Sequence, residues 1–418
     1  MKVALIDNTN NNFFAFARYL HDLGVDAYLF TIPHSKFKHY LPEADTFTDV
    51  KNIKWIRYFP VPINNLNWIF LRKKKIKKEL DKFDLIITCG LSSAFLERIG
   101  IRSDIIIPFG EDLYKYPFHK VNFSLTLDSI RSLFWNSQAK YQRKAYQHAR
   151  FFITDGDYIL SRKAIKSLNL TVSNIGLPML YNKENLINKE NIDLWNFLDS
   201  HDFILFNHSR QIWKTPNKHL DDCMNFGGAK RNDKLIRAFS QYIKNSKYKK
   251  PLLVLFNYGI DVVYSVQLIK DLKIEQYVKW MPLMNRKNIM YGLSKATFSA
   301  NAFREKKIDI GGVCYESLSV GTPHINNCVE ALTNKKHKFY NCPMIHALDE
   351  DEIVSIFADY EDNPDKYKRI GKESVEWFDQ NLGSQLAKRF KNILLLLNKN
   401  RELTHLDKPV KDLVTYAD

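Results

Sequence analysis

The sequence predicts an α/β protein made of two doubly wound Rossmann-like domains. Short apolar runs alternate along the chain with amphipathic stretches, beginning with Lys2–Ile6, Phe13–Leu23 and Val25–Phe30. A strand, a loop, a helix ended by a glycine and a second strand form the βαβ unit of a parallel sheet. With 418 residues, the chain is long for one core and sufficient for two.

The alternation recurs through residues 1–180, which we predict to form the N-terminal domain. Further apolar runs occur at Asp84–Thr88, Asp104–Pro108 and Phe151–Thr154. Runs that are apolar throughout are typical of strands buried on both faces of a parallel sheet. The polar, asparagine-rich stretch 181–200 is predicted to be a linker.

A second series predicts a C-terminal domain over residues 201–380. Its expected strands are Phe203–Asn207, Pro251–Phe256, Val278–Met281, Thr297–Ala300 and His324–Asn326. Its expected helices are Asp233–Ile243, Ser265–Leu272, Arg286–Leu293 and Val313–Val320. The region 381–418 is predicted to form a C-terminal helix and tail that pack back on the N-terminal domain. We expect a ligand cleft between the domains, because open α/β sheets bind ligands at the carboxyl ends of their strands.

Composition narrows the classes of function. The formal net charge of +16 favours an anionic partner such as a phosphate, a nucleic acid or an acidic membrane surface. The five cysteines lack C-x-x-C spacing and indicate reduced thiols, neither a disulfide frame nor a metal site. The start of the chain, MKVALIDNTN, lacks the apolar stretch of a signal peptide, and no apolar run approaches the roughly 20 residues of a membrane span. We therefore expect a cytoplasmic protein.

The segment Ile308–Pro323, IDIGGVCYESLSVGTP, is the most informative part of the chain. Gly311 and Gly312 precede a short expected helix and leave backbone N–H groups free for an anion or for sugar hydroxyls. Glu316, one turn into that helix, can accept hydrogen bonds from both hydroxyls of a ribose. The alternative is that Glu316 only complements the helix dipole.

Basic residues stand at the same expected sheet edge. Ser209 and Arg210 follow the strand Phe203–Asn207, and Lys230 precedes the next helix. An arginine fork and a lysine point charge suit a diphosphate, although both residues could instead be solvated surface bases. Neither half has a G-x-G-x-x-G motif after its first strand, which argues against a dinucleotide-dependent oxidoreductase.

These motifs occur in the order known from one enzyme family. HSRQIW, KRNDKLIRAF and GGVCYESLSVGTPHI resemble the C-terminal domain of glycosyltransferase family four and its bacterial capsule and lipopolysaccharide relatives. The resemblance implies the two-domain GT-B architecture. It also implies that Arg210 and Lys230 bind the donor diphosphate and that Glu316 binds the ribose. We assign the other donor-binding positions to Ser209, Asp309, Gly311, Gly312 and Thr322.

The sequence departs from the family pattern at three places. The first glutamate of the family's E-x7-E motif falls on Ile308, with Asp309 one position later. Arg231 stands where the family usually has glycine. The segment Gln211–Ala229 is longer than usual, and we expect it to fold over the donor or to mediate assembly.

The N-terminal half resembles the same group. The segment ALIDNTNNNFFAFARYLHDLG matches the family's opening strand and loop, so Asn11 and Asn12 are expected near the donor phosphates, unless they are ordinary turn residues. In PFGEDLYKYPF, Asp112 matches an aspartate that faces the acceptor; alternatively it caps a helix.

The resemblance implies transfer with retention at the anomeric carbon and without a metal or another cofactor. The substrate would be a nucleoside diphosphate sugar, with UDP- and GDP-sugars favoured, and the acceptor a glycan, a lipid-linked sugar or a protein. The leaving diphosphate would assist deprotonation of the acceptor, with Arg210, Lys230 and Asp112 as the catalytic set. Two alternatives stay open: a catalytically inactive GT-B partner subunit, suggested by Ile308, and a nucleotide-sugar epimerase on the same frame.

The stretch Asn67–Lys78, NWIFLRKKKIKK, is expected to rest on an anionic leaflet at the inner face of the cell membrane. The residues expected to make this contact are Trp68, Phe70, Lys73, Lys74 and Lys75. The alternative is a solvated helix face. No other stretch interleaves basic and aromatic residues, so we do not expect nucleic-acid binding.

Overall fold

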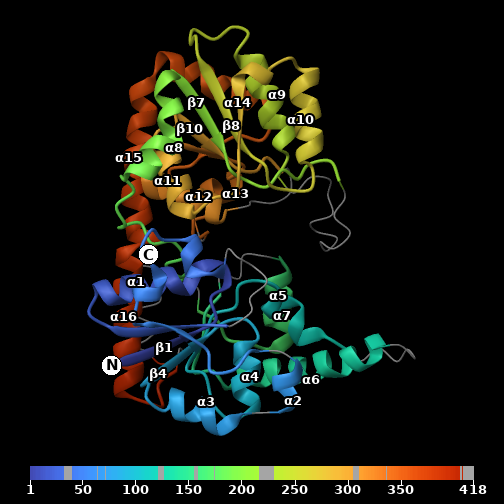
Figure 1. The fold of residues 1–418 in the computed structure, drawn as a ribbon, viewed down its shortest axis with the longest axis vertical. Coiled ribbons are helices and arrows are strands. Elements are labelled where there is room, and N and C mark those ends of the chain that lie inside the picture. The colour runs from blue at the N-terminus through green and yellow to red at the C-terminus, as the bar shows by residue number, and fades with distance from the viewer. Residues whose placement is uncertain are drawn as a thin grey trace. The chain divides into compact units, whose positions relative to one another are not determined.

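In the computed structural model the chain divides into two compact units, Met1–Tyr181 with Leu382–Asp418, and Asn182–Asn381. The structure describes residues 1–32, 40–63, 65–70, 72–120, 127–154, 159–173, 175–215, 230–304, 310–335, 337–404 and 407. Each unit is built on a six-stranded parallel sheet with helices around it (Figure 1). The predicted class of two Rossmann-like α/β domains is confirmed.

The sheet of the first unit has the order β3-β2-β1-β4-β5-β6. Its strands are β1 (Lys2–Ile6), β2 (Asp26–Thr31), β3 (Ile56–Tyr58), β4 (Leu85–Thr88), β5 (Ile105–Ile106) and β6 (Phe151–Phe152). Strand β1 pairs with β2 on one side and with β4 on the other, as in the registers Val3↔Ala27 and Val3↔Leu85. The chain therefore reverses its direction across the sheet between β1 and β4, which is where open α/β sheets bind ligands.

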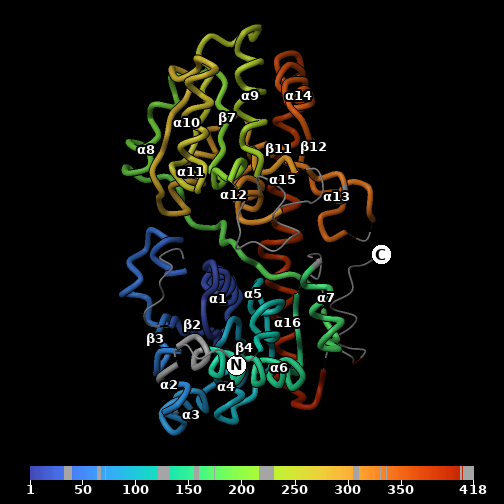
Figure 2. The backbone as a smooth tube through the Cα atoms, turned by 90° about the vertical axis from the view of Figure 1, so that its right-hand side faces the viewer, coloured from blue at the N-terminus to red at the C-terminus, as the bar shows by residue number. Residues whose placement is uncertain are grey.

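The helices of this unit include the C-terminal helix of the chain (Figure 2). They are α1 (Asn12–Asp22), α2 (Asn65–Ile69), α3 (Lys73–Leu80), α4 (Ser92–Arg98), α5 (Glu111–Tyr114), α6 (Leu127–His148), α7 (Ile159–Leu168) and α16 (Ser384–Lys399). Helix α1 ends where Gly24 takes a positive φ of 75° and Val25 N–H donates to the Leu20 carbonyl (2.9 Å), a Schellman motif. Phe390 of α16 lies in the same core as β1 and meets Phe16 of α1 at 4.8 Å between ring centroids.

The sheet of the second unit has the order β12-β11-β10-β7-β8-β9. Its strands are β7 (Phe203–Asn207), β8 (Pro251–Phe256), β9 (Val278–Met281), β10 (Phe298–Ala300), β11 (His324–Asn326) and β12 (Ile345–His346). Its helices are α8 (Lys189–Trp195), α9 (Asn232–Tyr242), α10 (Val262–Asp271), α11 (Arg286–Ser294), α12 (Gly312–Val320), α13 (Val329–Thr333), α14 (Glu350–Asp362) and α15 (Pro364–Asn381). The reversal point here lies between β7 and β10.

Short 3₁₀ helices connect some of these elements: η1 (Thr9–Asn11), η3 (Pro42–Ala44), η4 (Val50–Asn52), η5 (Tyr116–Phe118), η6 (Asn196–Ser200) and η7 (Glu275–Tyr277). Within the described ranges, no helix combines the length and the apolar character that a membrane span requires.

Trp68 does not lie where the sequence suggested. Its side chain is 2% exposed, with its ring centroid 6.2 Å from that of Phe95 and 5.7 Å from that of Tyr141. Because this indole fills the core of the first unit, the expectation that Trp68 contacts a membrane is wrong. The neighbouring Ile69 and Phe70 are exposed.

Helix α11 is fixed in place by one tryptophan. The fully buried Trp195 of α8 donates its indole N–H to the Asn288 carbonyl of α11 at 2.9 Å. Gly292, one turn further on, lets the helix approach the ring: a Cβ atom there would lie 2.7–2.9 Å from three indole carbons. Because Arg286 is the first residue of α11, this contact also positions the Arg286 side chain.

We expect Gly292→Ala to destabilise the protein by about 1–3 kcal/mol, because the added methyl group overlaps the indole. Helix propensity alone predicts the opposite sign, a gain of about 1 kcal/mol. The measurement is the melting temperature, with Lys372→Ala at an exposed position of α15 as the control. A Gly292→Ala variant at least as stable as the wild type would contradict the packing described.

Candidate functional site

A buried polar network lies at the carboxyl ends of β7 and β10. Asn207, the last residue of β7, donates its side-chain N–H to the Ala300 carbonyl at 3.0 Å. Its Oδ1 accepts from Ser209 Oγ at 3.1 Å and from Asn232 Nδ2 at 3.2 Å. These bonds fix the backbone that follows β7. Arg210, the residue after Ser209, is exposed to solvent.

Lys230 belongs to this network. The residue is 9% exposed, and its ammonium group donates to Oδ1 of Asn301, directly after β10, at 2.8 Å. Its backbone is held on both sides, because Lys230 N–H donates to the Ile212 carbonyl and its own carbonyl accepts from Phe303 N–H. The structure thus brings Lys230 and Ser209 together at the carboxyl ends of β7 and β10, next to Arg210.

Arg231 occupies a left-handed conformation with φ 56° and ψ 46°. A glycine adopts this conformation without strain, whereas a side chain costs about 1 kcal/mol or more. The Arg231 guanidinium offsets part of this cost by bonding both carboxylate oxygens of Asp233 at 3.0 Å.

The start of the long segment Gln211–Ala229 is tied to Asp261. This buried carboxylate accepts the backbone N–H groups of Trp213 (2.6 Å) and Lys214 (2.7 Å). Burial acts to raise the pKa of Asp261, but hydrogen bonds from this turn outweigh it and hold the pKa below its usual value. Residues 216–229 lie outside the described residues, and so do Ile308 and Asp309.

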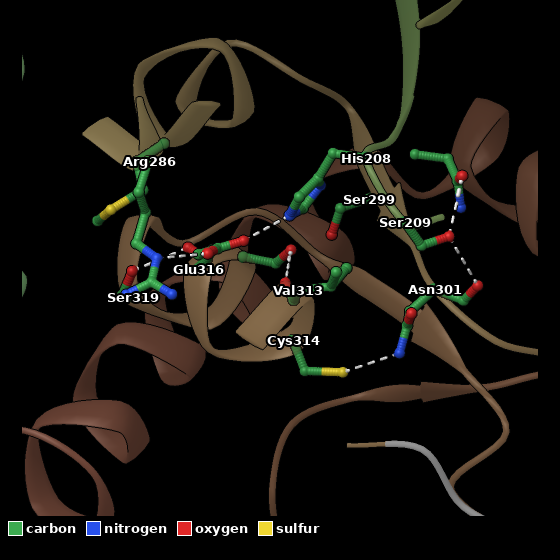
Figure 3. Close-up of polar contacts among 12 residues, drawn as sticks. His208, Ser209, Arg286, Ser299, Asn301, Val313, Cys314, Glu316 and Ser319 are labelled. Carbon is green, nitrogen blue, oxygen red and sulfur yellow. Dashed lines mark hydrogen bonds and ion pairs between the residues drawn. The ribbon is translucent and has the colours of Figure 1, made fainter. Parts of the chain in front are cut away.

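Glu316 is a buried carboxylate held from two sides (Figure 3). Its side chain is 8% exposed; Oε2 lies 2.6 Å from His208 Nε2, and Oε1 lies 2.8 Å from Arg286 Nε. Burial acts to raise the pKa of Glu316, but the hydrogen bond with His208 and the charge of Arg286 outweigh it, so the pKa lies below its usual value. Glu316 is therefore ionised at neutral pH, in a paired and desolvated setting.

Among the described residues other than the glycine's own chain neighbours, no atom lies within 4 Å of a Cβ built on Gly311 at the start of α12. The nearest described atom to a Cβ built on Gly312, apart from the backbone of its own helix, is Oε1 of Glu316, at 3.9 Å. Thr322, by contrast, is buried and donates its hydroxyl to the Leu293 carbonyl at 2.7 Å, which joins the chain after α12 to the end of α11.

Contacts among three side chains, Cys314, His324 and Ser299, hold the first turn of α12 on the sheet. Cys314 Sγ lies 3.0 Å from Nε2 of His324, whose Nδ1 lies 2.8 Å from Ser299 Oγ. Asn301 donates to the same sulfur at 3.7 Å. Burial, reinforced by the charges of His208 and Lys230, lowers the pKa of His324 to about 3, so its ring carries no charge.

In the first unit, the opening loop is organised by asparagines. Asn8 donates to Oδ1 of Asn11 at 2.6 Å, and Asn11 donates to the Leu41 carbonyl at 2.8 Å. Asn11 has a positive φ of 61°, and the buried Asn12 is the first residue of α1. The asparagine side chain of Asn11 therefore supports the loop conformation directly.

Asp112 joins the ends of two neighbouring strands. Its Oδ2 accepts from Gly90 N–H after β4 at 2.9 Å, and its Oδ1 accepts from Phe109 N–H after β5 at 3.0 Å. Burial raises the pKa of Asp112 to about 6, although the backbone N–H groups act against it. The alternative that Asp112 caps a helix is wrong, because the N-cap of α5 is Gly110 and the side chain of Asp112 binds backbone groups outside this helix.

Asp7 is a residue that the sequence reasoning missed. It directly follows β1, has a positive φ of 78° and is partly buried. Burial raises the pKa of Asp7 to about 7; the Asn8 N–H acts against this rise, and the charge of Asp112 adds to it. A Cβ on Gly90 would lie 2.6 Å from Oδ2 of Asp7, so the carboxylate rests against the end of β4, at the reversal point of the sheet. The sequence feature that could have pointed to Asp7 is the position of an acidic residue directly after the first apolar strand.

Among the described residues, no three or more His, Cys, Asp or Glu side chains are grouped so that they could hold a metal ion.

No family model matches the sequence, and a search of curated proteins finds no significant match. Solved structures with a similar fold include HepE of Anabaena in complex with UDP, with a TM-score of 0.56 and 14% identity over 95% of this chain and 100% of that one. UDP-GlcNAc 2-epimerase from Neisseria meningitidis bound to UDP-GlcNAc has a TM-score of 0.55 and 14% identity, over 96% and 100% of the two chains. The lipopolysaccharide outer core galactosyltransferase WaaB has a TM-score of 0.50 and 13% identity, over 95% of this chain and 99% of that one. At these identities the likeness shows the fold, which is GT-B; membership of glycosyltransferase family four stays a prediction.

We expect Asp7→Asn to be more stable than the wild type at pH 8, by about 2 kcal/mol. The folded protein holds a proton on Asp7 up to about pH 7, whereas the unfolded chain releases it near its ordinary pKa of 3.8. The higher pKa of Asp7 in the folded protein stabilises the wild type below about pH 4, and this stabilisation is lost as the pH rises through 7. Asparagine cannot ionise and also tolerates a positive φ.

The measurement is the difference in melting temperature between variant and wild type from pH 4 to pH 8, with Asp193→Asn at an exposed position of α8 as the control. A difference that stays constant over this range would count against a raised pKa at Asp7.

Proposed function

We propose that the protein is a glycosyltransferase that moves a sugar from a nucleoside diphosphate sugar to a glycan, lipid-linked or protein acceptor. The observation that carries the proposal is the arrangement at the carboxyl ends of β7 and β10. There the exposed Arg210 and the buried Lys230 accompany an ionised, fixed carboxylate, Glu316. Cations suit the diphosphate, and a fixed carboxylate suits the ribose hydroxyls.

In this proposal, catalysis rests on charge neutralisation. Negative charge grows on the diphosphate as the sugar leaves, so groups that hold it strengthen their contact in the transition state. Lys230 is suited to this role because its ammonium group is already positioned by Asn301 and is withdrawn from water. Retention without a metal is the course that the family resemblance implies, and we propose it here.

The nucleotide is proposed to be UDP, because HepE and the Neisseria epimerase share this fold and were crystallised with UDP and UDP-GlcNAc. The epimerase also makes nucleotide-sugar epimerisation the second candidate function.

The first test is a melting-temperature screen against UDP, GDP, CMP, TDP and ADP, with and without EDTA. A ligand bound only to the folded state raises the melting temperature. We expect a shift with UDP that EDTA leaves unchanged, and Arg210→Ala should weaken UDP binding about 10- to 100-fold, since a charged hydrogen bond contributes roughly 1.5–3 kcal/mol. Arg369→Ala, at an exposed position of α15, is the matched control. If Arg210→Ala bound UDP as tightly as the wild type, the diphosphate assignment would be wrong.

Transfer and epimerisation differ in their products. A transferase releases UDP from the nucleotide sugar in the presence of an acceptor, whereas an epimerase inverts one ring carbon and can keep the sugar on the nucleotide. Proton NMR of UDP-GlcNAc incubated with the protein, with and without a glycan extract, separates the two.

We also propose peripheral contact with an anionic membrane, through a surface defined by α3 and the residues before it. Lys73, Lys74 and Lys75 are exposed, while Ile76 and Leu80 of the same helix are buried. Ile69 and Phe70, just before α3, are 49% and 65% exposed. Exposed apolar side chains next to basic ones suit the interface of an anionic bilayer.

We expect the triple variant Lys73→Gln, Lys74→Gln, Lys75→Gln to bind anionic vesicles about 100-fold less tightly, since each basic residue contributes about 1 kcal/mol. Co-sedimentation with phosphatidylglycerol-containing vesicles measures this, with Lys366→Gln, Lys368→Gln, Lys372→Gln on α15 as a control of equal charge. Equal binding by both triple variants would place the contact elsewhere or show it to be non-specific.

A further inference from the structure

One buried nitrogen next to Glu316 has no partner within the part of the chain that the structure describes. It is Nδ1 of His208, a residue whose side chain is 3% exposed. A buried polar atom left without a hydrogen bond costs roughly 1–3 kcal/mol, so such an atom in a folded protein requires an explanation.

The His208 ring cannot easily turn away. Its other nitrogen, Nε2, is bound to Glu316 at 2.6 Å, and the rings of Phe206 and Phe256 lie 5.7 and 6.2 Å from it, both at 66°. Because Glu316 is held on its other oxygen by Arg286, the carboxylate too is fixed. The imidazole is therefore oriented by its contacts with two aromatic rings and by the hydrogen bond at Nε2.

The contact with Glu316 also determines which nitrogen of His208 must carry a proton. An ionised carboxylate only accepts hydrogen bonds, so Nε2 must carry the proton. Nδ1 accepts a hydrogen bond when the ring is neutral and donates one when the ring is charged, and a ribose hydroxyl, which can donate or accept, complements either form. Arg286 from α11 binds the other oxygen of Glu316, and His324 lies close enough to His208 for the two rings to interact electrostatically.

We propose that His208 contacts the nucleotide directly, with Nδ1 forming a hydrogen bond with a ribose hydroxyl beside Glu316. The inference rests on the proposed function and deepens it, because it restricts the donor to ribonucleotides. A site built to bond a hydroxyl discriminates strongly against an analogue that lacks it, since its own buried groups are then left unpaired.

The test compares UDP with 2′-deoxy-UDP and 3′-deoxy-UDP by calorimetry. We expect the wild type to prefer UDP over at least one deoxy form by about tenfold or more, the ratio that one hydrogen bond supplies. His208→Gln and His208→Asn separate the two edges of the ring. The glutamine amide N–H can take the place of Nε2 and keep the bond to Glu316, whereas the asparagine amide reaches only the position of Nδ1.

If Nδ1 binds the ribose, His208→Gln loses the preference and His208→Asn keeps more of it. If His208 only positions Glu316, the order is reversed, and His208→Gln behaving like the wild type overturns the proposal. Melting temperatures of both variants, compared with that of the wild type, show that the folds are intact. Binding of UDP without any ribose preference overturns this inference alone, whereas failure of every nucleotide to bind overturns the proposed function as well.

Discussion

The buried negative charge of Glu316 is the constraint around which the second unit is arranged. A carboxylate removed from water is stable only when it is paired and hydrogen-bonded. Its two partners come from separate elements: His208 from the end of β7 and Arg286 from the start of α11. Helix α11 must therefore be held at a defined distance, which the contact between Trp195 and Gly292 achieves. The packing of a tryptophan in the core and the orientation of a carboxylate at the site are thus parts of one arrangement.

The two units differ in the charge that they collect at the ends of their strands. In the second unit, Arg210 and Lys230 supply positive charge near the paired carboxylate of Glu316. In the first unit, Asp7 and Asp112 follow β1 and β5, and burial raises the pKa of both, to about 7 and about 6. Carboxyl groups with a pKa near neutrality exchange protons with hydroxyls, whereas cations suit phosphates. Under the proposed function, each unit taken by itself would suit one of the two kinds of substrate that a sugar transfer needs.

Much of the fold was predictable from the sequence, because the central strands are buried on both faces and their apolar runs show this directly. The predicted runs Lys2–Ile6, Phe203–Asn207 and Pro251–Phe256 are β1, β7 and β8 with the same bounds. The strands β3 and β12 were missed because they have only three and two residues and are not fully buried. Glu316 could be singled out from its local glycine motif. The pairing of Glu316 with His208 could not be predicted, since the two residues are 108 positions apart and only the folded sheet brings them together.

Backbone strain occurs at three positions of the candidate site, Asp7, Asn11 and Arg231. The chain has 15 glycines in 418 residues, and Asp7, Asn11 and Arg231 take positive φ angles that glycine would adopt without cost. Each of these three residues has a side-chain hydrogen bond that offsets part of the cost: Asp7 with Asn8 N–H, Asn11 with the Leu41 carbonyl, and Arg231 with Asp233. All three stand where the chain passes from a strand or a loop to the start of a helix, next to the candidate ligand groups. Such conformations persist only where the surroundings impose them. These hydrogen bonds therefore help to hold the loops at the strand ends in one conformation despite the strain of the positive φ angles.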